Sequence, residues 1–125
     1  MTSIGSTKIS SVDGAGAVAF GSSIALSASN TNPQETVVFS IEVPEGKTWR
    51  LKYASVCCFG WGKWRLKVDD IICAGGATNP SNPNSREDFP DCLDIPPGSV
   101  INLIYLYSNG PNNMPVDGYM GLLEY

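Results

Sequence analysis

The sequence contains no histidine, the side chain whose charge changes most readily near neutral pH. Its absence excludes Ser-His-Asp and Cys-His nucleophilic arrangements and removes a common zinc ligand. The cysteines form no Cys-x-x-Cys pair, and no glycine-rich phosphate loop precedes a helical segment. We therefore expect no enzymatic site, no metal and no cofactor in this chain.

Long apolar runs and an excess of basic residues are also missing. No stretch of about 18 apolar residues is present, which is the length that a membrane-spanning helix needs. The formal net charge is -4, whereas nucleic-acid binders normally carry a basic excess. The first residues lack the basic start and apolar core of a secretion signal. We expect neither a membrane nor a nucleic acid as partner.

Four cysteines are present, and two of them are neighbours in the chain, Cys57 and Cys58. Adjacent residues of a strand point to opposite faces, so these two cannot reach one common partner. In the absence of a secretion signal the default is four free thiols, buried as small hydrophobic side chains. The alternative is one disulfide bond, between Cys73 and Cys92.

The length of 125 residues and the apolar content of 42% suit one compact domain with its own core. Residues 1–13 are small and polar, which is typical of an arm that is flexible or ordered by a partner. Residues 14–125 are expected to form the domain. Within it, residues 14–29 predict one or two slim strands broken near Gly21.

Alternating side chains then predict a succession of strands. Residues 37, 39, 41 and 43 are apolar, and Trp49 begins a strand whose odd-numbered residues share one face. Trp64 begins another, and Asp69-Asp70 turns it into a hairpin. Residues 100–107 are apolar on both faces. Seven to nine such strands without a convincing helix predict an all-β, antiparallel two-sheet sandwich of the jelly-roll kind.

Two segments without periodicity, residues 74–90 and 108–117, are expected to be long loops. Loops of this length inside a compact domain usually contact a partner or carry function. Trp61 lies between two glycines and is the best candidate for an exposed contact, as a sugar platform or an interface anchor. A buried edge position is the alternative. Trp49 and Trp64 fit inward positions.

An acidic group near the end of the first of these segments consists of Glu87, Asp88, Asp91 and Asp94. Three interpretations apply to it: a solvated acidic loop, a weak cation site, or a pair of carboxylates for acid–base catalysis. The solvated loop is the interpretation that the composition favours.

A basic group lies earlier in the chain. Arg50 and Lys52 share one outer face, and a second outer face, expected to lie beside the first, carries three more cations. A basic face and an acidic loop suit pairing between subunits, while the alternative is a soluble surface that resists aggregation. The full basic set is Lys47, Arg50, Lys52, Lys63, Arg65 and Lys67.

One corner pattern occurs twice, at residues 42–51 and 94–103, where a β-branched residue and proline precede a glycine. The segments VPEGKTW (43–49), IPPGS (95–99) and GYMGLLEY (118–125) resemble small jelly-roll structural proteins of tailed bacteriophages. That group includes capsid cement (decoration) proteins and fibre heads. The resemblance implies a homotrimer with a short arm, docked on a capsid shell or a fibre.

The expected function is therefore that of a virion structural protein, a capsid cement protein assembled in the host cytoplasm that bridges capsid subunits. Its expected partners are copies of itself, trimers being favoured, and the major capsid protein or another virion protein. The low share of charged residues, 16%, agrees with surface hidden in an oligomer. The alternative is a glycan- or receptor-binding module, with Trp61 and the two long loops as its site.

Overall fold

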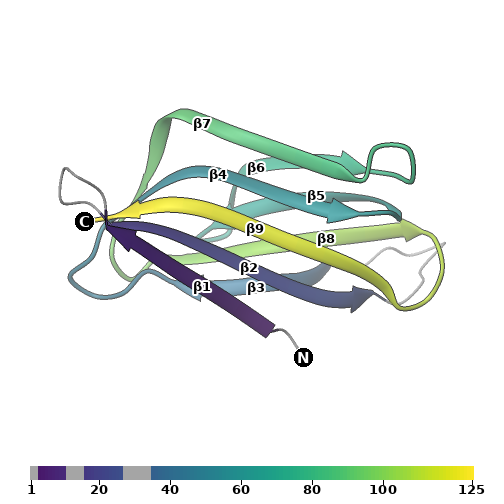
Figure 1. Ribbon diagram of the computed structural model, residues 1–125, viewed down its shortest axis with the longest axis horizontal. Coiled ribbons are helices and arrows are strands. Elements are labelled where there is room, and N and C mark those ends of the chain that lie inside the picture. Colours follow the sequence, from purple (N-terminus) through teal and green to yellow (C-terminus); the bar gives the residue numbers. More distant parts are fainter. Residues whose placement is uncertain (1–2, 11–15, 27–34) are drawn as a thin grey trace.

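The computed structural model describes residues 3–10, 16–26 and 35–125, the first of these segments as backbone only. This part of the chain folds into strands alone, which form two layers (Figure 1). The strands are β1 (Ser3–Ser10), β2 (Gly16–Leu26), β3 (Glu35–Glu42), β4 (Trp49–Cys58), β5 (Trp61–Val68), β6 (Ile71–Thr78), β7 (Asn84–Ile95), β8 (Val100–Asn109) and β9 (Met114–Glu124).

The strand order is that of a jelly roll. One sheet has the order β1-β2-β9-β4-β7 and the other β3-β8-β5-β6. Each pair of hydrogen-bonded neighbouring strands in the described residues is antiparallel. The pairs β5–β6, β4–β7, β3–β8 and β2–β9 are nested like one long hairpin that has been rolled up. The prediction of an all-β, antiparallel two-sheet sandwich is confirmed.

Side chains that alternate along the strands fill the space between the sheets. Trp49 and Trp64, expected to point inward, are 2% and 1% exposed. Tyr105 is fully buried, and its hydroxyl group forms a hydrogen bond of 2.6 Å with the hydroxyl group of Thr78. Because Tyr105 also donates to the carbonyl of Gly60, the polar atom at this end of the core is satisfied.

Two β-bulges change which residues face the core. On β4 the register shifts between Leu51 and Tyr53, so Lys52 is an extra residue relative to β9. After it the inward residues are Ala54 and the alternate positions that follow, not Tyr53 as the uninterrupted alternation predicted. That part of the prediction is wrong, because one inserted residue exchanges the two faces of a strand.

The second bulge lies on β3, between Val37 and Phe39. Val37, which was expected to point inward, is 46% exposed, and Val38 is fully buried in its place. Phe39 and Val43 are buried as predicted.

The two expected long loops are largely strand. The first, residues 74–90, contains the end of β6 and the start of β7, and only residues 79–83 connect them. The second, residues 108–117, is reduced to the turn at 110–113. The N-terminal segment 14–29 forms one continuous strand through Gly21 rather than two, as far as it is described.

The expected arm, residues 1–13, contributes β1, which pairs along β2. Its other residues lie outside the described part of the chain. All four cysteines are free thiols, and Cys58 is the most deeply buried of them.

Candidate binding surfaces

The basic residues lie on opposite outer faces of the sandwich. Arg50 and Lys52 are on β4 in the five-stranded sheet, whereas Lys63, Arg65 and Lys67 are on β5 in the four-stranded sheet. The expectation that these two groups lie beside each other is wrong. The chain changes sheets at residues 59 and 60, so two strands that follow each other in sequence face away from each other.

The sixth cation, Lys47, lies outside both groups. It is exposed in the turn between β3 and β4, where its backbone N–H donates to the carbonyl of Pro44.

Most of the acidic group is engaged in local contacts. Asp94 pairs with Arg50 at 2.8 Å, and Asp88 pairs with Arg86 at 2.9 Å. These pairs are exposed, so they contribute little to stability. No group of three or more His, Cys, Asp or Glu side chains in the described residues is placed to hold a metal ion.

Glu87 has a different environment from its neighbours in sequence. Its carboxylate accepts a hydrogen bond from the backbone N–H of Gly75 at 3.2 Å. Gly75 belongs to β6, an edge strand of the four-stranded sheet, so Glu87 covers part of an open strand edge. Asp91 is exposed, and Cys92 beside it has a positive φ of 58°, within an irregular part of β7.

The outer face of β5 carries an aromatic side chain and three cations in a row. Trp61 stands at the start of the strand, and residues 63, 65 and 67 follow on the same side. Lys67 pairs with Glu35 on β3 at 3.3 Å. Lys63 and Arg65 have no acidic partner within the described segments. The row therefore includes two cations with available charge.

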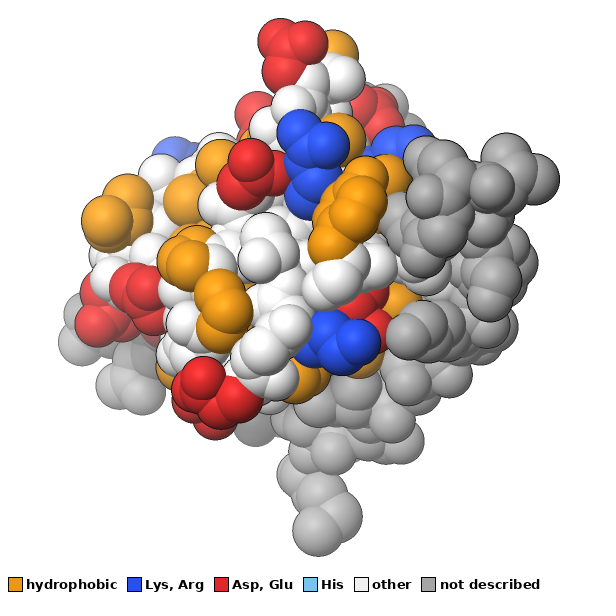
Figure 2. All heavy atoms as spheres, turned by 90° about the vertical axis from the view of Figure 1, so that its left-hand side faces the viewer, with side chains coloured by type: hydrophobic (Ala, Val, Ile, Leu, Met, Phe, Trp, Pro, Cys, Tyr) orange, Lys and Arg blue, Asp and Glu red, His pale blue; other side chains and the backbone are white. Residues whose placement is uncertain are grey.

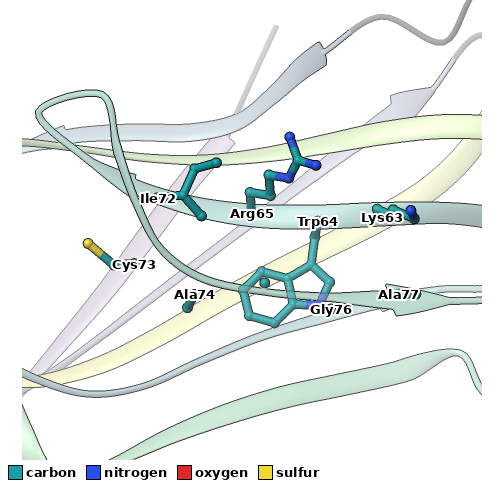
Figure 3. Close-up of a pocket in the computed structure, with 9 residues that line it drawn as sticks. Lys63, Trp64, Arg65, Ile72, Cys73, Ala74, Gly76 and Ala77 are labelled. Atoms are coloured by element: carbon teal, nitrogen blue, oxygen red, sulfur yellow. The ribbon is translucent and has the colours of Figure 1, made fainter.

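A groove of about 510 Å³ lies against this row. Small residues, Gly75 and Ala77 on β6, stand opposite Arg65 and Lys63 in the register and leave the space open. Ile72 and Arg65 point to the same side of the β5–β6 pair, and Trp64 points to the other (Figure 3). The groove therefore lies on the outside of the sheet, and its rim is apolar on one side and basic on the other.

Trp61 itself is 51% exposed, and Phe59 beside it is 57% exposed. Of the two alternatives for Trp61, an exposed contact and a buried edge residue, the structure has the exposed position. Ser108 donates a hydrogen bond to the backbone carbonyl of Trp61 at 2.9 Å, which fixes the backbone. The indole N–H has no partner in the described part of the chain and is free to bind a ligand.

On the outer face of the five-stranded sheet, two tyrosine rings pack against glycines of neighbouring strands. A Cβ atom at Gly121 would collide with the ring of Tyr53, and one at Gly21 would lie 3.2 Å from the ring of Tyr119. The guanidinium of Arg86 lies 4.1 Å from the centre of the Tyr53 ring. Arg86 therefore covers the ring of Tyr53, whereas Tyr119 on the same face is 43% exposed.

The end of the sandwich that carries the C-terminus holds the turns 43–48, 69–70 and 96–99. Figure 2 shows acidic, basic and hydrophobic side chains mixed over the described part of this end. Asp69 and Asp70 are exposed there. Because charges of both signs are interspersed, the described part of this end has no single-sign patch that would favour one charged ligand.

Sequence reasoning identified Trp61, Lys63 and Arg65 but missed the other side of the groove. Gly75, Ala77 and their neighbours were assigned to a loop because small residues give no alternating signal. A hairpin through Asp69-Asp70 could have been extended past residue 73, which would have placed them opposite β5.

Comparison with known proteins adds no relative to these observations. No model of a known protein family matches the chain, and a search of curated proteins gives no significant match. Within the residues that the structure describes, no helix has the length and the apolar character required to cross a membrane.

Proposed function

We propose that this chain is a virion structural protein, a capsid cement or decoration protein that stabilises a shell by bridging its subunits. It would be assembled in the host cytoplasm and be present in many copies per particle. Jelly rolls are common in viral coat proteins, which supports the proposal, but they also occur in lectins. Fold alone does not decide between these uses, so the argument rests on the surfaces.

The observation that carries the proposal is the apolar surface left open on the four-stranded sheet. Val37 on β3 and Ile72 on β6 are 46% and 54% exposed, and Trp61 on β5 lies between those strands. Val37 and Ile72 stand on the two edge strands of this sheet. Exposed large hydrophobic side chains spread over one sheet favour a protein-binding surface over a purely solvated one. A cement protein needs such a surface, because it acts through buried area.

The charges on the two sheets indicate how copies of the chain could pair. Lys63 and Arg65 lie on the same face without acidic partners, while Asp91 is exposed on β7 at the edge of the other sheet. Complementary charges at two different places on one protein favour head-to-tail contacts, which form a ring when the rotation between subunits closes. This arrangement supports a homo-oligomer, with a trimer favoured.

The proposed role involves no chemistry. The space between the sheets is filled by side chains such as Trp64 and Tyr105, and the carboxylates of the acidic group are held by separate partners. Stabilisation of a shell requires shape and contact area, which a rigid sandwich supplies.

The test is the abundance and location of the chain in purified particles, measured by quantitative mass spectrometry and by cryo-electron microscopy with a labelled variant. A cement protein is expected in hundreds of copies distributed over the shell. A handful of copies at a vertex or on the tail would refute the cement role and indicate a fibre component.

A second candidate function is a glycan- or receptor-binding module. The observation that favours it is the pair of exposed aromatic side chains, Phe59 and Trp61, at one end of the sandwich. A glycan array probed with wild type and Trp61→Ala tests this function, and Tyr119→Ala on the other sheet is the matched control. If wild type binds no glycan, the candidate is removed.

A further inference from the structure

The outer face of the β5–β6 pair combines three features. The groove is lined by two cations without acidic partners in the described residues, Lys63 and Arg65, and by small residues of β6. Beyond the groove, two residues before Lys63 on the same strand, Trp61 presents an exposed indole ring. We propose that this groove binds an acidic oligosaccharide, a short sugar chain that carries carboxylate or sulfate groups. The inference rests on the second candidate function and adds the site and the class of sugar.

On the outer face of β5, Lys63 and Arg65 are the cations without a carboxylate partner in the described residues, while the exposed Lys47 and Lys52 lie away from the groove. Lys67, Arg50 and Arg86 each have a carboxylate within 3.3 Å or less, so their charge is already balanced. Lys63 and Arg65 lie on neighbouring outward positions of β5 and have none. The planar guanidinium of an arginine binds a carboxylate or sulfate through two parallel hydrogen bonds, which makes Arg65 the principal anion contact.

The shape of the groove suits a ring rather than a flat backbone. Gly75 and Ala77 occupy the positions on β6 where larger side chains would fill the space beside the cations. Ile72 closes one side of the groove with an apolar surface, which matches the C–H face of a sugar ring. The pocket therefore offers apolar contact on one side and charge on the other.

The spacing of the contacts requires more than one sugar unit. Trp61 and Arg65 are four residues apart on one strand, which corresponds to about 13 Å at the rise of a β-strand. A single sugar ring cannot contact both side chains, whereas a short chain stacked on Trp61 can extend along the groove to Arg65. The ligand is therefore an oligosaccharide and not a free monosaccharide.

The two other polyanions fit these observations less well. Nucleic acids are held mainly by many phosphate contacts, and this chain has a net charge of -4 and two available cations at the groove. An acidic peptide would use the charges, but its extended backbone does not require the open space that Gly75 and Ala77 leave beside the cations. Both remain as probes in the test.

The test is a printed array of sialylated, uronate-containing and sulfated oligosaccharides, each paired with its neutral parent. Oligothymidylate and a polyglutamate peptide serve as the alternative polyanions. Wild type should bind one or more acidic members at least tenfold more tightly than the matching neutral chains and the two alternative polyanions. Urea denaturation of each variant checks that it is folded.

Three variants locate the site. Arg65→Gln and Lys63→Gln should each weaken binding of the acidic chain several-fold and leave the neutral parent unaffected. Ala77→Leu fills the groove without changing charge and should weaken both. Lys52→Gln, an exposed cation on the opposite sheet, is the matched control and should change nothing.

The outcomes separate this inference from the function on which it rests. Equal binding of acidic and neutral sugars, lost in Trp61→Ala, would overturn the inference and keep the glycan-binding function. Binding of no sugar would overturn both. Tighter binding of oligothymidylate or polyglutamate would overturn the assignment of a sugar, and an effect of Lys52→Gln equal to that of Arg65→Gln would overturn the site.

Discussion

Gly118 on β9 lies directly against side chains of the opposite sheet, and adding one methyl group there tests how the two sheets fit together. A Cβ atom at this position would lie 2.9 Å from Cγ1 of Val38 and closer still to the side chain of Leu103. Both neighbours are fully buried, so neither can move into solvent. We expect Gly118→Ala to destabilise the protein by about 1–3 kcal/mol, the usual cost of overpacking a core.

The second half of this prediction uses Leu103→Ala. Alone, this truncation should cost about 3–5 kcal/mol, in the upper part of the range for buried leucines, because β8 is held between two neighbouring strands and cannot collapse into the cavity. In the double variant the new methyl group of residue 118 enters the space that Leu103 has left. The double variant should therefore lose less stability than the sum of the two single variants, by at least about 1 kcal/mol in the free energy of unfolding.

The assay is urea denaturation followed by tryptophan fluorescence for the two single variants and the double variant. Leu106→Ala on the outer side of the same strand is the matched control, and it should cost less than Leu103→Ala and show no coupling to Gly118→Ala. Strictly additive effects of Gly118→Ala and Leu103→Ala would refute the contact between the two sheets.

Three further predictions concern other parts of the sandwich. Burial raises the pKa of Tyr105 above its usual 10.0, so its stabilising contribution is fully present below about pH 10 and is lost as pH rises towards the folded value. The free energy of unfolding should therefore fall above pH 10 by up to about 1.4 kcal/mol per pH unit, and Tyr105→Phe should reduce this slope, whereas an unchanged slope would contradict the assignment. Asp70→Gly should stabilise the β5–β6 hairpin by about 0.5–1 kcal/mol in the same assay, because Asp70 has a φ of 67° in the turn; a loss of stability would contradict this. Thiol titration should detect all four cysteines in urea but leave Cys58 unreactive in the native protein, and a disulfide would lower the count in urea.

Hydrophobic alternation was sufficient to predict the architecture. Trp64 and Leu66 alternate with cations on β5, and the two aspartates of its turn both adopt the positive φ that a tight hairpin requires. Such signals are local, so they can be read from neighbouring residues. The two glycines that flank Trp61 left both an exposed and a buried position open, and the structure shows the exposed one.

The β-bulges could not be predicted, because they depend on how neighbouring strands fit. Lys52 gives no local sign that it is the extra residue of β4. Lys52 becomes the extra residue only through the pairing of β4 with β9. As a result, the later residues of β4 point to the opposite face from the one that simple alternation predicts. Val38 replaces Val37 in the core of β3 for the same reason.

The candidate groove was only half predictable. Lys63 and Arg65 stand out in the sequence, but Gly75 and Ala77 contribute by being small, and an absent side chain gives no periodic signal. Strand β7 was hidden in the same way, because an edge strand rich in polar residues lacks the apolar alternation of a central strand. The opposite orientation of the two basic groups follows from the change of sheet after β4, which is a property of the topology.

The account depends most on the claim that the open face of the four-stranded sheet is a surface for association between copies of the chain. Light scattering coupled to size-exclusion chromatography measures this directly on the purified protein. We predict a molar mass of three times 13.3 kDa for the wild type and a shift to lower mass when Ile72 and Val37 are both replaced by lysine. A mass of 13.3 kDa for the wild type at every concentration, unchanged in the variant, would contradict the claim.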